Sequence, residues 1–301
     1  MKSDSGRAER GGRATTGGPV CRMLPDGRRL HLQHGPIDLI VEAFGALGEI
    51  ELAYRQAWAR FRTVLPELVE ELPLLRRPVD ERHPGVAGAV AKRMFAACWR
   101  HRGQFITPMA AVAGSVADEV TAAMTAGRRL DKAYINNGGD IALHLLPGTR
   151  LDVGLVANPG RPALGAITQI EAEWPVRGIA TSGWRGRSHS LGIADAATVL
   201  AADAAAADAA ATIVANAVDI DHPAVRRMRA CDLDETSDLR EHRVTVEVGP
   251  LPAAAVDEAL ARGAQVAETL CAEGMIFGAA LALQGRIRTV GVPLAAIAAA
   301  A

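Results

Sequence analysis

The sequence predicts an α+β protein, in which long helices are mixed with runs of consecutive strands. Some stretches repeat apolar residues at the spacing of one helix face, and shorter stretches alternate apolar with polar residues, as half-buried strands do. The short stretches follow one another with turn residues between them, which argues against a strict strand–helix–strand repeat. We expect two pseudo-repeated α/β lobes with mixed or antiparallel sheets and a ligand cleft between the lobes.

Composition places the chain among globular proteins. Hydrophobic residues make up 49% of its 301 residues and charged residues 22%, with a formal net charge of −1. A nearly neutral chain lacks the positive field that recruits nucleic acid, so we expect no nucleic-acid partner. Residues 1–20 are polar and mildly basic and indicate a disordered arm, whereas residues 21–301 indicate a single domain of two interleaved lobes.

Neither a secretory signal nor a membrane span is recognisable. The first 20 residues have no apolar core, and every long apolar stretch is interrupted by charge. The four cysteines show no CxxC spacing, which favours reduced and buried side chains. We therefore expect a cytoplasmic protein without a membrane partner.

The first half of the chain is predicted to begin with a hairpin and to continue with three helices. Pro25-Asp26-Gly27 is a turn sequence between two arms of alternating apolar residues. Apolar residues then recur at helical spacing, and Pro66 predicts a kink or a division of the first helix. The predicted elements are a strand at 37–41, helices at 49–72, 86–101 and 107–126, and a connection at 73–88. Small residues, Gly114 among them, dominate one face of the helix at 107–126 and allow a close approach.

The second half is predicted to hold most of the strands. Turn residues separate short apolar runs, and an Ala-rich helix that carries Asp208 and Thr212 follows the run at 197–201. The predicted strands are 134–136, 141–146, 151–157, 166–172, 178–180, 243–248, 275–283 and 286–290, and a further helix spans 252–272.

Two Ala-rich segments resemble each other. Each starts with a threonine, Thr107 or Thr198, and reaches an aspartate about three helical turns later, Asp118 or Asp208. A duplicated α+β unit would leave this pattern, and so would chance similarity between two Ala-rich helices.

The pair Asp208 and Thr212 is a candidate metal site. Residues four apart share one face of a helix, so a carboxylate and a hydroxyl lie one above the other. Mg²⁺ binds such hard oxygen ligands and completes its shell with water or substrate phosphate. The alternative is a solvated aspartate and a threonine that bonds back to its own helix.

Two loops are candidates for binding phosphate. The turn Asn136-Asn137-Gly138-Gly139-Asp140 allows backbone N–H groups to approach an anion, although Asn-Gly is also an ordinary hairpin turn. The segment Thr181-Ser182-Gly183 with Arg185 and Arg187 offers hydroxyls and guanidinium groups to phosphate oxygens, although loop arginines are often only solvated. His189 is a candidate acid or base, or a structural histidine. The other histidines form no zinc motif, and no GxGxxG or P-loop pattern occurs.

Three longer segments together resemble the ApbE superfamily of FAD:protein FMN transferases, and more closely an uncharacterised cytoplasmic branch of it. They are LHLQHGPIDLIVEA at 30–43, NNGGDIALHL at 136–145 and the block at 179–219 that begins IATSGWRGRSHSLG. The resemblance covers most of the chain after about residue 20. It implies an ApbE-like fold and transfer of FMN from FAD to an acceptor protein with Mg²⁺.

The resemblance also implies roles for individual residues. The family's Gly-Gly-[Asp/Glu] turn matches 138–140, its Ala-Thr-Ser-Gly segment matches 180–183, and its Ser-His pair matches Ser188 and His189. Its metal-binding Asp-x-x-x-Thr matches Asp208 and Thr212. The continuation Ser190-Leu191-Gly192 departs from the Ile-Asp-Pro segment that is usual in the transferases.

Three functions remain open from the sequence. The first is a Mg²⁺-dependent enzyme that acts on FAD or a related phosphorylated cofactor, with an acceptor protein as partner. The second is a non-catalytic protein that binds a flavin- or pterin-like cofactor, which the altered Ser-His continuation leaves open. The third is a structural or oligomeric subunit. Small apolar faces make a homodimer plausible whichever function holds. For the enzyme, the expected catalytic residues are His189 and Asp208 and the metal ligands Asp208 and Thr212. The expected cofactor-binding residues are Asn137, Gly138, Gly139, Asp140, Thr181, Ser182, Gly183, Arg185, Arg187 and Ser188.

Overall fold

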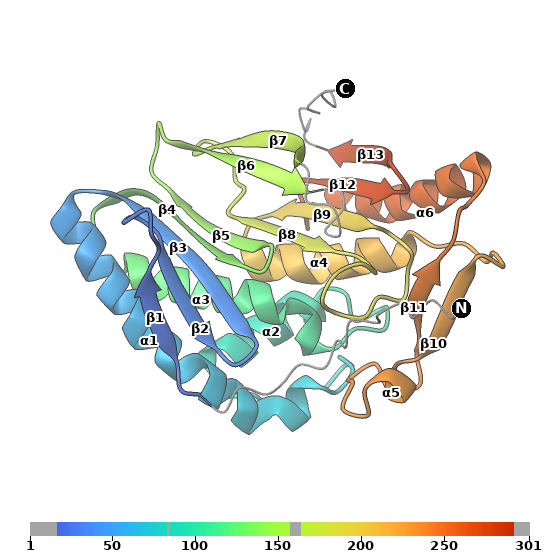
Figure 1. Cartoon of the computed structure of the whole chain (residues 1–301), viewed down its shortest axis with the longest axis horizontal. Coiled ribbons are helices and arrows are strands. Elements are labelled where there is room, and N and C mark those ends of the chain that lie inside the picture. Colours follow the sequence, from blue (N-terminus) through green and yellow to red (C-terminus); the bar gives the residue numbers. More distant parts are fainter. Residues whose placement is uncertain (1–16, 83–84, 157–163, 292–301) are drawn as a thin grey trace, which may run out of the picture.

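One nine-stranded sheet organises the molecule (Figure 1). The computed structural model describes residues 17–82, 85–156 and 164–291. Every neighbouring pair of strands in the sheet is antiparallel. The strands in spatial order are β1 (Val20–Met23), β2 (Leu30–His34), β3 (Ile37–Gly45), β4 (Leu130–Asn137), β5 (Asp140–Leu145), β8 (Gly178–Ser182), β9 (Ala196–Ala201), β12 (Gly278–Leu283) and β13 (Arg286–Gly291).

The remaining elements are two ribbons and the helices. Each ribbon is an antiparallel pair of strands: β6 (Arg150–Val156) with β7 (Leu164–Glu171), and β10 (Val225–Arg229) with β11 (Arg243–Val248). The helices are α1 (Leu47–Leu75), α2 (Ala89–Trp99), the 3₁₀ turn η1 (Pro108–Ala111), α3 (Val112–Thr125), α4 (Ala204–Ala217), the short α5 (Ala230–Leu233) and α6 (Ala253–Ala272).

The order strand–strand–helices–strand–strand occurs twice along the chain. The first run is β2, β3, then α1 to α3, then β4, β5. The second is β8, β9, then α4 to α6 with the strands of the β10–β11 ribbon between them, then β12, β13. The two runs lie side by side in the sheet, joined where β5 pairs with β8. The α+β class is therefore confirmed, with all strands of both runs in one sheet. The expected cleft between two lobes stays a prediction.

The two faces of the sheet are covered differently. Side chains alternate between the faces along a strand, so neighbours such as Ala142 and Leu143 belong to different cores. Ala142 packs with the helices, and Leu143 packs with the β6–β7 ribbon, which lies on the side away from α3 and α4 in Figure 1. The larger core uses many alanines, which let α3 and α4 approach the sheet and each other closely.

The structure corrects some of the element predictions. α1 is one helix that continues through Pro66 and Pro73, so the division at Pro66 was wrong; its apolar face stays buried from Ala53 to Leu75 and holds the helix together. The predicted helix at 107–126 begins as the 3₁₀ turn η1. β10 and α5 were not predicted, because the sequence VRRMRACDL has neither clear alternation nor the length of a helix.

Two further expectations concern the ends of the chain and the membrane. Residues 1–16 of the predicted arm lie outside the described residues, and Val20 already belongs to β1. In the part of the chain that the structure describes, no helix combines the length and apolar character needed to cross a bilayer.

Candidate functional site

Several predicted site residues meet at one end of the sheet. The Gly138-Gly139 turn joins the end of β4 to the start of β5. Because β8 runs antiparallel to β5, its last residues Thr181 and Ser182 arrive at the same end. The segments 136–140 and 181–183, far apart in sequence, therefore lie together as the sequence analysis required.

Both glycines of the turn have backbone angles that favour glycine, with φ of +68° at Gly138 and +118° at Gly139. The Gly139 N–H donates to Asn136 Oδ1 at 2.8 Å, which closes the turn. The amide of Asn137 does not face outward: its Nδ2 donates to the carbonyl of Ala113 at 3.0 Å. Asn137 thus ties the turn to the first residues of α3 instead of offering its side chain to a ligand.

Asp140 is a buried carboxylate behind this turn. Its Oδ1 accepts a hydrogen bond from the Thr181 N–H at 3.1 Å. Burial raises the pKa of Asp140 to about 7, although the Thr181 N–H and the charge of Arg187 act in the opposite direction. Arg187 reaches the turn from the basic loop and donates from Nη2 to the carbonyl of Pro36 at 3.0 Å. Among the two predicted phosphate-binding arginines, Arg187 is the one placed beside the glycine turn and Asp140.

Asp208 lies on α4 and is a neighbour of Asp140. Burial raises its pKa well above the usual range, and the negative charge of Asp140 adds to this effect. Asp208 Oδ2 accepts a hydrogen bond from the Gly114 N–H in the first turn of α3 at 2.9 Å. The alternative of a simply solvated aspartate is therefore wrong, because this side chain connects two helices. Thr212 follows one turn later on α4 and is partly buried.

A second aspartate makes the reverse connection. Asp118 on α3 accepts hydrogen bonds from the first two N–H groups of α4, those of Ala204 at 3.0 Å and Ala205 at 2.8 Å. Each helix thus carries a carboxylate that binds the N-terminal turn of the other, where the helix dipole favours negative charge. The contact is close, because a Cβ on Gly114 would lie 2.1 Å from the Ala204 carbonyl oxygen.

The basic loop between β8 and β9 pairs Arg185 with a carboxylate of the protein. Arg185 was expected to bind phosphate, but its Nε donates to Asp195 Oδ1 at 2.6 Å and its guanidinium stacks on Trp184. Asp195 is buried and also accepts the backbone N–H of Gln284 at 2.6 Å. Arg185 therefore compensates a buried charge and anchors the loop. Gly183 has a packing role as well, since a Cβ there would lie 2.7 Å from the Asp195 carbonyl oxygen.

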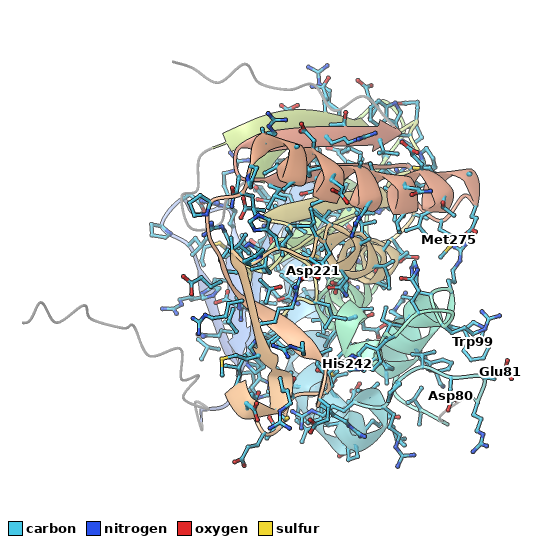
Figure 2. All side chains as sticks on the ribbon, turned by 90° about the vertical axis from the view of Figure 1, so that its right-hand side faces the viewer. Asp80, Glu81, Trp99, Asp221, His242 and Met275 are labelled. Atoms are coloured by element: carbon cyan, nitrogen blue, oxygen red, sulfur yellow. The ribbon has the colours of Figure 1, made fainter. Side chains whose placement is uncertain are left out.

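The Ser188–His189 pair is exposed at the outer part of the loop. The nearby Asp234 has a lowered pKa, mainly through hydrogen bonds from Thr236 and to a smaller extent through the charge of His189. The segment of β10, α5 and β11 therefore reaches the basic loop. It also contacts the first half of the chain, because the ring centroids of His242 and Phe105 lie 3.8 Å apart. His242 is labelled in Figure 2.

The sequence analysis missed the roles of two residues that shape this site and gave a third without its partner. Asp118 was noticed only as part of an internal resemblance, and Asp195 was not singled out. Gly114 was expected on a helix face of small residues that allows a close approach, and α4 is what approaches it. The helical spacing of Asp118 gives no sign of its partner, because the N–H groups that it binds lie 86 and 87 residues later in the chain. A glycine inside an Ala-rich helix was the one signal available, since glycine there often marks a close approach of two backbones.

The residues present fit a Mg²⁺ ion that is shared with a substrate. Asp208, Thr212 and Asp140 supply hard oxygen atoms, and a divalent cation would relieve the repulsion between the two carboxylates. Within the described ranges, no three His, Cys, Asp or Glu side chains gather into a cluster that could hold a metal by themselves. Mg²⁺ tolerates such a sparse protein site because it keeps waters and binds substrate phosphate.

A comparison with protein families decides the relationship of the chain. The model of the family described as AbpE bacteria matches residues 21–289. The chain belongs to this family. Membership of the ApbE superfamily, inferred above from three sequence segments, is thereby confirmed.

Curated relatives of this ApbE-like chain carry names without a function. A UPF0280 protein of Methanosphaerula palustris is 35% identical over 164 residues, which are 50% of this chain and 65% of the relative. A UPF0280 protein of Methanothrix thermoacetophila is also 35% identical over 164 residues, which are 52% of this chain and 64% of the relative. The matches thus span slightly less than two thirds of these relatives.

Solved structures of distant similarity include two proteins named ApbE. The ApbE protein of Thermotoga maritima has a TM-score of 0.34 and 12% identity, with 82% of this chain and 76% of that chain covered. A mutant of the flavin transferase ApbE of Vibrio cholerae has a TM-score of 0.35 and 13% identity, with 91% and 97% covered. Scores this low carry no argument, so membership of the family rests on the family model.

Proposed function

We propose that this protein is a Mg²⁺-dependent enzyme that acts on FAD or a related phosphorylated cofactor. Transfer of the FMN part of FAD to a hydroxyl of an acceptor protein, with AMP as the leaving group, is the reaction that its family suggests. A cytoplasmic location and a homodimer belong to the same proposal. The observation that carries it is the meeting of Asp140 and Asp208 beside Arg187 and the glycine turn at one end of the sheet.

Each residue of the site would have its own role in binding or proton transfer. Asp208 and Thr212 would hold Mg²⁺, which would supply positive charge to offset that of a diphosphate. Arg187 and the N–H groups of Gly138 and Gly139 would bind phosphate oxygens. His189, exposed at the rim, would accept the proton of the attacking hydroxyl. Arg185 has no direct role in this assignment, because it is paired with Asp195.

The first test is a thermal-shift series with FAD, FMN, ADP and a reduced pterin, each with and without Mg²⁺. A ligand at 100 times its Kd adds about 2.7 kcal/mol of stability, which gives a clear rise in Tm. We expect a rise with FAD that needs Mg²⁺ and that Asp208→Ala removes. Asp203→Ala is the matched control, because Asp203 lies at the start of the same helix but is exposed and caps only Ala206.

The outcomes separate the candidate functions. A rise with FAD that survives in Asp208→Ala would contradict the metal assignment. A rise that ignores Mg²⁺ would favour the non-catalytic binder. No shift with any of the four ligands would contradict a flavin-related function and favour a structural subunit.

One observation favours the binder as the second candidate. Asp208 is already hydrogen-bonded to Gly114, and Arg185 is already paired with Asp195. Two groups expected to act on a substrate are thus engaged within the protein, which suits a rigid binding surface better than a reacting one. Release of AMP from FAD in the presence of Mg²⁺ and an acceptor would exclude this alternative.

A further inference from the structure

The contact between α3 and α4 points to an additional residue that controls the candidate site. Asp208 is held by the first turn of α3 through the Gly114 N–H. That turn is held in place from the other side by Asn137, whose Nδ2 donates to the Ala113 carbonyl. The orientation of the Asp208 carboxylate therefore depends on how α4 sits against α3.

Asp118 is the side chain that fixes this relation. Both of its oxygens are used, one for the Ala204 N–H and one for the Ala205 N–H. These N–H groups open α4 and have no partner inside their own helix. Asp203, the residue before the helix, binds only the Ala206 N–H, so it caps α4 without connecting it to α3.

We propose that Asp118 is a positioning residue: by holding the first turn of α4 against α3, it sets the position of Asp208 and of the oxygen atoms that face the bound ligand. Asp118 itself is one helical turn beyond Gly114, and its side chain hydrogen-bonds to the first turn of α4 and to neither the glycine turn nor the basic loop. Its effect on the ligand passes through Asp208, which responds both to the placement of α4 and to the negative charge of Asp118. The consequence for Mg²⁺ rests on the proposed function, whereas the coupling between the helices does not.

The close packing explains how a shift of α4 relative to α3 reaches Asp208. The Gly114 backbone lies against the Ala204 carbonyl with no room for a Cβ, and α4 is lined with buried alanines. Small side chains leave no flexible layer between the helices, so a shift of the α4 N-terminus moves the backbone that carries Asp208.

The test compares Asp118→Ala with Asp203→Ala, since both variants remove a carboxylate from the N-terminus of the same helix. Amide hydrogen exchange of Gly114 is measured without metal or ligand, with Ile135 in the centre of the sheet as reference for global stability. We expect Gly114 to exchange about tenfold faster in Asp118→Ala, because its Asp208 acceptor is displaced. The same amide should change less than about twofold in Asp203→Ala.

Mg²⁺ affinity is the second readout, with ADP as a defined diphosphate probe and titration calorimetry as the method. Residues that orient a metal ligand change affinity by about ten- to a hundredfold when replaced, so Asp118→Ala should weaken Mg²⁺ binding by at least about tenfold. Asp203→Ala should bind as the unchanged protein does. Asp118→Asn, which keeps one acceptor oxygen, should fall between the two and serves if the alanine variant does not fold.

The two readouts test separate parts of the proposal. Unchanged exchange at Gly114 in Asp118→Ala, or an equal increase in Asp203→Ala, would overturn the positioning role. Faster exchange with unchanged Mg²⁺ affinity would overturn the effect on the site. If the unchanged protein binds no Mg²⁺, the proposed function fails, and the exchange measurement still decides whether Asp118 positions Asp208.

Discussion

Asp118 and Asp208 make the same kind of contact in two halves of the molecule, yet their surroundings differ. Asp118 has both oxygens occupied by backbone N–H groups of α4. Asp208 binds the N-terminus of α3 and also faces the charge of Asp140. Burial raises the pKa of both carboxyls, to about 6 at Asp118 and well above the usual range at Asp208, where the charge of Asp140 adds to the effect. The same contact, a carboxylate that binds the N-terminal turn of a neighbouring helix, thus has a structural role at Asp118 and belongs to the candidate site at Asp208.

The largest expected effect comes from filling the narrow space between α3 and α4, because the contacts of Asp118 and Asp208 both need the helices to lie this close. Gly114→Ala places a Cβ 2.1 Å from the Ala204 carbonyl oxygen, so the helices must separate. We expect a loss of about 3 kcal/mol in the free energy of unfolding, at the upper end for overpacking. Chemical denaturation measures it. Gly48→Ala in α1, where a Cβ meets no atom within 4 Å, is the control and should not lose stability; an equal loss in both would contradict the close approach.

An effect of similar size, confined to a pH range, concerns the ionisation of Asp118. The folded state raises the pKa of Asp118 from 3.8 to about 6, mainly through burial. A raised pKa means that the contribution to stability is complete below about pH 4 and is lost as the pH rises through about 6. The amount is about 3 kcal/mol. Asp118→Asn should therefore gain stability relative to the unchanged protein between pH 4 and pH 7, measured as the difference in unfolding free energy. A constant difference across this range would show that Asp118 does not titrate as its burial implies.

The smallest effect concerns the cap that belongs to α4 alone. Asp203 accepts the Ala206 N–H at 2.7 Å and is exposed, so Asp203→Ala should cost about 1 kcal/mol. The loss should be seen in Tm and should leave ligand binding unchanged. If Asp203→Ala weakened Mg²⁺ binding as much as Asp118→Ala, α4 stability in general would explain the effect, and the comparison would lose its meaning.

Local patterns in the sequence were sufficient for most of the fold. Strands such as Arg243–Val248 alternate clearly, and helices such as Ala253–Ala272 repeat apolar residues on one face. Contacts between residues that are far apart in the sequence leave no comparable local pattern. Arg185 and Arg187 look alike in the sequence, but one is paired with Asp195 and the other reaches the glycine turn, because side-chain directions in a loop depend on what folds around it.

The internal resemblance between the segments ending at Asp118 and Asp208 illustrates the same limit. In the order of elements, α3 is the last helix before β4, whereas α4 is the first helix after β9, so the two segments do not occupy equivalent places in a repeated unit. The two aspartates are nevertheless partners in one contact. The pattern identified the right residues, and only the structure could give the relation between them.

The anchor of the basic loop has a practical consequence for anyone who shortens this chain. Asp195 accepts the N–H of Gln284, which sits in the tight turn between the last two strands of the sheet. A truncation that removes this final hairpin would therefore strip a donor from a buried carboxylate almost ninety residues upstream. The first segment to lose its anchor would be the basic loop, far in sequence from the deleted residues. Loss of binding in such a fragment would therefore say nothing about the deleted strands themselves.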